Sequence, residues 1–159
     1  FILSFSLALL FSFLTNKLSN NASNLIMILL ILLVIAIGII FDMIGVAVLT
    51  AKESTFHAMS SKKIKGAKIA TKLIRNNVRV ASFCNDIIGD ICGIVSGGLG
   101  AVLAISMSNY IDITIATIIT SAIISALTVT GKAIFKTVAV KKADNILFLA
   151  SKLMSIFNK

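Results

Sequence analysis

The stretch LIMILLILLVIAIGIIFDMIGVAVL occupies residues 25–49 and decides the fold class. Residues 25–41 carry no polar side chain, and a single aspartate, Asp42, interrupts the remainder. A helix needs about 20 apolar residues to cross the hydrocarbon core of a bilayer, so this stretch predicts a transmembrane helix. The composition agrees, because 58% of the residues are hydrophobic and only 13% are charged, whereas a soluble domain carries about 25% charged residues. We therefore predict an all-α, polytopic membrane helix bundle.

Working outward, the apolar pattern predicts two further spans, at about 80–107 and 113–131. Residues 50–79 are basic with a partial apolar stripe, which is typical of amphipathic helices lying at a membrane surface. Residues 138–157 have apolar side chains at helical spacing and predict a juxtamembrane helix. Residues 1–15 are expected to be the remaining part of a truncated extra transmembrane helix, with a signal peptide as the alternative.

The positive charges are concentrated in two segments. Residues 50–80 hold eight of the 15 lysines and arginines, six more lie from Lys132 onward, and the other is Lys17. Because basic loops stay on the cytoplasmic side, we expect the connection and the C-terminus in the cytoplasm of a multi-pass plasma (inner) membrane protein. The net charge of +9 then reflects contact with the lipid bilayer, and we expect no nucleic-acid partner.

No set of residues typical of an enzyme is found in the sequence. It contains no Gly-rich phosphate loop, no Ser/His/Asp set and no CxxC pair, and its single histidine, His57, lies in the basic connection. Cys84 and Cys92 are about 12 Å apart along one predicted helix, too far for a disulfide, so we interpret them as packing residues. We therefore expect a non-enzymatic protein.

Three acids, Asp42, Asp86 and Asp90, fall inside predicted spans. Each costs about 2.5–3.5 kcal/mol at the centre of a membrane helix, so each is expected to face the bundle interior, a partner or water. At about 1.5 Å per residue, Asp42 lies about 12 Å and Asp90 about 15 Å from the inner boundary, on helices of opposite direction. We therefore expect these two carboxylates to form one polar site, with Asp86 one turn closer to the cytoplasm on the face of Asp90.

Small residues continue that face. Gly89, Gly93 and Gly97 form overlapping GxxxG steps, which allow close approach of another backbone or leave carbonyls free to coordinate an ion. Carboxylates, carbonyls and the Ser96 hydroxyl are hard oxygen ligands suited to Mg²⁺ or Ca²⁺. The predicted metal site comprises Asp42, Asp86, Asp90, Gly89, Gly93 and Ser96.

Three simpler interpretations stay open, and the first is that Asp86 lies near enough to the interface to be hydrated. Gly93, Gly97 and Gly100 are equally suited to serve helix packing alone. Asp42, in turn, has two candidate charge partners at the end of the third span, Lys132 and Lys136.

Three motifs carry a family resemblance. GAKIATKLIRNNVRVASFCNDIIGDICGIVSGGLGA (66–101) resembles a basic helix, a short break and a membrane helix that opens with Ile-Gly-Asn. GKAIFKTVAVKKADNI (131–146) resembles a Gly-Glu-Leu-Val-Pro-Lys turn and the juxtamembrane helix after it, and FDMIGVAVL (41–49) resembles Phe-Ser-Ala-Ala-Glu-x-Ala-Leu. In this order, over roughly 38–157, they resemble the transmembrane domain of the CorC/cyclin-M (CNNM) family of magnesium transporters.

The resemblance implies a dimer of three-helix domains with a juxtamembrane helical belt and a Mg²⁺ site near mid-membrane. The family serine falls on Asp42, and the Ile-Gly-Asn motif falls on Ile88, Gly89 and Asp90. The family's final-motif glycine and lysine fall on Gly131 and Lys136.

The chain also departs from the family pattern. Gly45 replaces the first-motif glutamate, and Lys132 and Phe135 replace the final-motif glutamate and proline. The family's cytoplasmic nucleotide-binding module has no counterpart in these residues, so ATP-linked regulation has no visible site in them, and a separate regulatory subunit is one candidate partner.

The leading hypothesis is transport or binding of divalent cations, Mg²⁺ first and Co²⁺ second, by a homodimer without an organic cofactor. One alternative is a non-transporting membrane scaffold that oligomerises through its glycine-rich helix face. Another is a proton-coupled carrier, since isolated intramembrane acids also suit proton relays.

Overall fold

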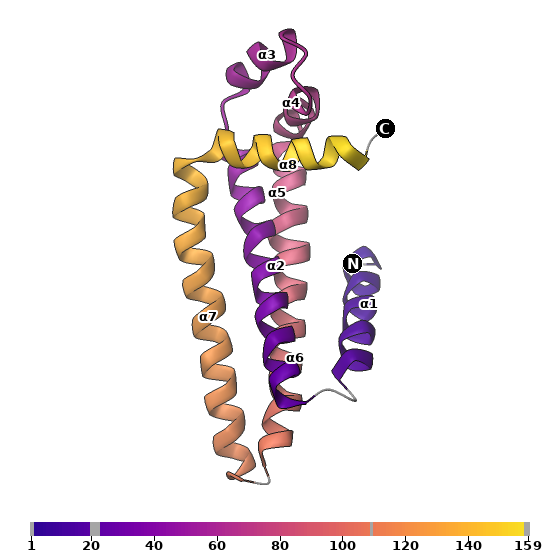
Figure 1. Ribbon diagram of the computed structural model, residues 1–159, viewed down its shortest axis with the longest axis vertical. Helices are drawn as coiled ribbons and strands as arrows, with labels where there is room; N and C mark the ends of the chain where they lie inside the picture. Colours follow the sequence, from indigo (N-terminus) through magenta and orange to yellow (C-terminus); the bar gives the residue numbers. More distant parts are fainter. Residues whose placement is uncertain (1, 20–22, 109, 158–159) are drawn as a thin grey trace. The chain divides into compact units, whose positions relative to one another are not determined.

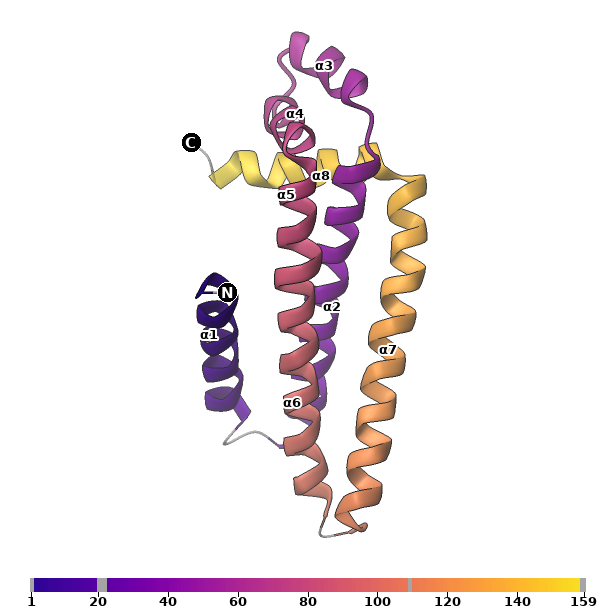
Figure 2. The same ribbon diagram turned by 180° about the vertical axis from the view of Figure 1, so that it is seen from behind.

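The structure, a computed structural model, describes residues 2–19, 23–108 and 110–157. Within these residues the chain is all-α and contains no strand, which confirms the predicted fold class. The elements, labelled in Figures 1 and 2, are α1 (Ile2–Ser19), α2 (Asn24–Thr50), α3 (Glu53–Ser61), α4 (Ala67–Arg75), α5 (Asn77–Ser82), the π-helix η1 (Phe83–Ile88), α6 (Gly89–Met107), α7 (Ile113–Lys141) and α8 (Ala143–Phe157).

Three helical segments are long and apolar enough to cross a membrane: Asn24–Thr50, Asn77–Met107 and Ile113–Lys141. They correspond to the three complete spans predicted from the sequence, and they indicate a membrane protein. Within α1, Ser4–Phe13 forms a shorter apolar helix. The predicted extra span over residues 1–15 stays a prediction, and Phe1 lies outside the described residues.

The third span differs from its predicted bounds. The sequence predicted an end near Gly131, but α7 continues to Lys141 and the juxtamembrane helix α8 begins at Ala143 rather than at residue 138. Lysines 132, 136 and 141 were interpreted as a boundary, yet lysine is a good helix former and residues 132–141 contain no glycine or proline. The helix therefore extends through them.

The chain divides into two compact units. The first comprises Phe1–Ile39 and Ile87–Gly131, and the second comprises Ile40–Asp86 and Lys132–Lys159. The helices α2 and α7 contribute residues to both units. The single domain predicted for residues 24–157 stays a prediction.

The core of the first unit is aliphatic. It is formed by Met27, Ile31, Val34 and Ile35 of α2, Ile91, Cys92, Val95, Leu99 and Leu103 of α6, and Ile124 of α7. Glycines allow two close contacts: a Cβ at Gly38 would lie 2.9 Å from Cys92 Cβ, and one at Gly100 would overlap Ile124. Cys84, in the second unit, and Cys92 are both buried.

The second unit combines a small apolar cluster with polar contacts. Val48, Phe56, Ala70, Ile74 and Leu147 form the cluster. In this unit α8 packs against α4 and runs crosswise to the end of α7 (Figures 1 and 2). The carboxylate of Asp144, in the first turn of α8, accepts hydrogen bonds from the Lys52 N–H (2.9 Å) and the Thr55 hydroxyl (3.1 Å), which anchors the start of α3.

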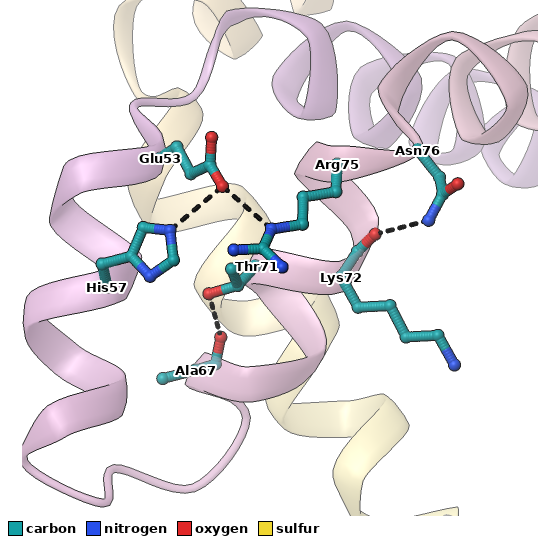
Figure 3. Close-up of polar contacts among 7 residues, drawn as sticks. All are labelled: Glu53, His57, Ala67, Thr71, Lys72, Arg75 and Asn76. Atoms are coloured by element: carbon teal, nitrogen blue, oxygen red, sulfur yellow. Dashed lines mark hydrogen bonds and ion pairs between the residues drawn. The ribbon is translucent and has the colours of Figure 1, made fainter.

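Glu53 links α3 to α4 (Figure 3). Its Oε1 accepts a hydrogen bond from Arg75 Nε at 3.2 Å and lies 3.0 Å from His57 Nε2. The pKa of Glu53 is lowered, first by the Arg75 hydrogen bond and then by His57. The two helices meet at a tight turn in which Lys63 and Gly66 have φ values of 54° and 90°.

Candidate intramembrane polar site

Asp42 is the buried acid of the α2 span. Its residue is 2% exposed, and its Oδ2 lies 3.3 Å from Lys136 Nζ. The same oxygen receives no hydrogen bond from the described residues. The carboxylate therefore has a counter-ion, while its hydrogen-bonding capacity is unmet.

Lys136 reaches this acid because α7 continues past Gly131. Its side chain is 48% exposed, although its ammonium contacts a buried carboxylate. Lys132, the other predicted partner, lies one turn earlier and forms no ion pair with the described residues. Of the two candidate partners, Lys136 is the one in contact with Asp42.

Asn85 supplies a second buried oxygen acceptor. Its Oδ1 is buried and has no hydrogen-bond partner among the described residues. This oxygen occupies the space beside Gly45, where an added Cβ would overlap it. Asp42 lies three residues before Gly45, so the two share one face of α2. One face of α2 therefore carries Asp42 Oδ2 and, one turn further on at Gly45, meets Asn85 Oδ1. Neither oxygen has a hydrogen-bond partner among the described residues.

Asn85 belongs to the π-helix η1, which the sequence did not predict. Single π-turns inside α-helices are rare and frequently occur at functional sites. Asn85 was not among the predicted site residues, and its signal in the sequence is a polar amide inside an apolar span.

The other predicted metal-site residues have different surroundings. Asp86 and Asp90 are exposed in this chain, and Gly89 is buried. Ser96 is buried, and its hydroxyl donates to the Gly93 carbonyl at 3.0 Å, so this carbonyl already has a partner. A joint site of Asp42 with Asp90 stays a prediction, because these acids belong to different compact units.

The glycine row divides into open and packed positions. Among the described residues, a Cβ at Gly93, Gly97 or Gly98 would meet no atom within 4 Å, whereas one at Gly100 would overlap Ile124 of α7. Gly100 therefore packs within the chain, and Gly93 and Gly97 do not. Sequence reasoning missed the packing role of Gly38 and Gly45, which lie in the apolar stretch that was taken only as a span.

The described residues contain no group of three or more His, Cys, Asp or Glu side chains that could hold a metal ion. The Asp42 carboxylate and the Asn85 amide could hold a hydrated ion instead. Mg²⁺ typically keeps several waters and binds proteins through one or two carboxylates. The two oxygens are thus suited to a cation that brings its own water ligands.

Comparisons with protein-family models, with curated proteins and with solved structures found no match. The resemblance to the magnesium-transporter family therefore rests on the sequence motifs alone.

Proposed function

We propose that this chain binds divalent cations, Mg²⁺ foremost, within the membrane and passes them across it at a site centred on Asp42. The observation that carries the proposal is a nearly inaccessible carboxylate whose Oδ2 accepts no hydrogen bond from the described residues, on the α2 face that Asn85 Oδ1 also meets. Acceptors that lack donors favour a cation or water as the missing partner.

Lys136 is the resident counter-ion in this proposal. A buried carboxylate without a positive partner is strongly unfavourable, so the ammonium neutralises Asp42 when no metal is bound. The lysine side chain is half-exposed and flexible, which allows it to withdraw when a divalent ion arrives. Metal and ammonium then compete for one carboxylate.

Asp90 is the proposed second carboxylate. Its exposure on α6 leaves it available to a hydrated ion or to a partner chain. The family resemblance supports this role, because Asp42 and Asp90 fall on the motif positions that it assigns to the ion site. A homodimer, a cytoplasmic basic connection in the plasma membrane, and a separate regulatory subunit belong to the same proposal.

Mg²⁺ uptake into liposomes that contain the purified chain tests this function. Asp42→Asn keeps the shape of the side chain but removes its charge, and uptake should fall about tenfold or more, since one lost charged contact of about 1.5–3 kcal/mol has that effect. Asp112→Asn is the matched control, because Asp112 is an exposed acid outside the spans, and uptake should be unchanged. Equal uptake by wild type and Asp42→Asn would refute the proposal.

A second function, a membrane scaffold, is favoured by the open glycines of α6. Gly93, Gly97 and Gly98 leave room for another backbone. If scaffolding is the function, Gly93→Leu abolishes oligomerisation, Asp42→Asn leaves it intact, and Mg²⁺ has no effect on either. Proton entry without Mg²⁺ in the liposome assay would instead indicate a proton-coupled carrier.

A further inference from the structure

Three adjoining hollows lie along α4 and α5 in the second unit, where α8 packs against α4. The first, about 880 Å³, lies at the α3–α4 turn. The second, about 340 Å³, shares Ile69 with the first. The third, about 510 Å³, shares Leu73, Val80 and Met154 with the second. We call the three together the trench.

The rim of the trench is cationic. Lys68, Lys72 and Arg79 line successive hollows and are exposed. Lys68 and Lys72 are four residues apart and share one side of α4, whereas Arg79 lies on α5. No carboxylate among the described residues pairs with them, whereas the nearby Arg75 is paired with Glu53. The rim therefore offers unneutralised positive charge to an anion.

The third hollow is apolar. Phe41, Ile44, Phe83 and Leu153 are among its lining residues, and Arg79 is the only charged side chain among them. A volume of 510 Å³ lies within the range of about 300–1,000 Å³ for small-molecule sites, which are mostly apolar with a few placed polar groups. Leu153 and Met154 are 54% and 50% exposed, so an apolar ligand can enter beside them.

We propose that the trench binds one molecule of an anionic glycerophospholipid. Its phosphate lies between Lys72 and Arg79, and one acyl chain fills the apolar hollow beside Leu153 and Met154. A soluble phosphate would leave the apolar hollow empty, and a neutral lipid would leave the cations without a partner. Only a ligand with both parts matches the charge and the apolar lining together. The inference does not depend on the Asp42 site.

Binding of phosphatidylglycerol and of phosphatidylcholine with identical acyl chains, measured by native mass spectrometry on the full chain in detergent, tests the proposal. The wild type should prefer phosphatidylglycerol. Lys72→Gln combined with Arg79→Gln should weaken phosphatidylglycerol binding about thirtyfold, given the typical contribution of two cations at a lipid surface. Binding of phosphatidylcholine, whose choline cation offsets the charge of its phosphate, should weaken less.

Two further variants separate charge from shape. Lys62→Gln combined with Lys142→Gln removes the same charge outside the trench and should leave binding unchanged. Ala150→Phe keeps every charge but fills the apolar hollow, and it should weaken the binding of both lipids. This variant also provides the test if the Lys72/Arg79 pair of substitutions prevents folding.

Three results would overturn the proposal: equal affinity for the two lipids, undiminished phosphatidylglycerol binding by Ala150→Phe, or an equal loss in the Lys62/Lys142 control. Glycerol phosphate at millimolar concentration should not displace the lipid, because it lacks an acyl chain. Its displacement of the lipid would assign the rim to a soluble phosphate instead.

Discussion

The two compact units differ in the kind of contact that stabilises each of them internally. In the first, aliphatic side chains of α2 and α6 interdigitate, and glycine contacts bring the helices close. In the second, a smaller apolar cluster is joined by the Asp42–Lys136 ion pair, the Asp144 anchor and the Glu53 contacts. The first unit should therefore respond to changes of shape, and the second to changes of charge, pH and ions.

The largest effect is expected for Lys136→Met. It leaves Asp42 buried without a counter-ion, and breaking a buried pair in this way costs about 3–5 kcal/mol. In Mg²⁺-free buffer the free energy of unfolding should fall by an amount at the lower end of that range, because the Lys136 side chain is half-exposed. The double variant Asp42→Asn/Lys136→Met removes both charges and should unfold close to wild type. A single variant as stable as wild type would show that the ion pair contributes little to the second unit.

Smaller changes in the free energy of unfolding are expected for two glycine substitutions, one in α2 and one in α6, and the two changes should have opposite signs. Gly38→Ala forces a Cβ against Cys92 Cβ at 2.9 Å, so unfolding should become easier by about 1 kcal/mol, as overpacking typically costs. Gly97→Ala meets open space and should stabilise its helix by up to about 1 kcal/mol through helix propensity. Neither change should depend on pH or Mg²⁺. If Gly97→Ala destabilised the monomer, the space beside Gly97 would not be open as described.

The smallest effect is expected for Glu53→Gln, and it depends on pH. Because Arg75 and His57 lower the pKa of Glu53 in the folded state, its contribution is present above the unfolded pKa and is lost as the pH falls through the folded pKa. At pH 7 the variant should show faster amide hydrogen exchange in α3 than wild type. The difference should disappear in acid, and a difference that persists there would rule out the carboxylate as its cause.

The membrane fold could be predicted from composition and apolar run length, since a run such as residues 25–41 has no soluble alternative. Boundaries were less predictable. The lysines after Gly131 were interpreted as the end of a span. Residues 132–141 have good helix propensity, however, and α7 continues to Lys141. The π-turn at Phe83–Ile88 has no composition signal.

The candidate site was only partly predictable. A lone acid in an apolar run marks Asp42 as a site residue, and charge at the span end suggested Lys136. Periodicity identifies the face on which Asp90 and Gly97 lie but not what covers that face, so the same pattern fits a buried site and an open surface. Asn85 requires knowledge of the facing glycine, Gly45, which one sequence does not supply.

The most direct test of the central claim is Mg²⁺-dependent unfolding of Lys136→Met beside Asp42→Asn. A ligand at about 100 times its Kd stabilises the folded state by about 2.7 kcal/mol. If Lys136 and Mg²⁺ compete for Asp42, Lys136→Met should reach this stabilisation at a lower Mg²⁺ concentration than wild type, and Asp42→Asn should gain none. Equal stabilisation of all three proteins by Mg²⁺ would contradict a cation site at Asp42.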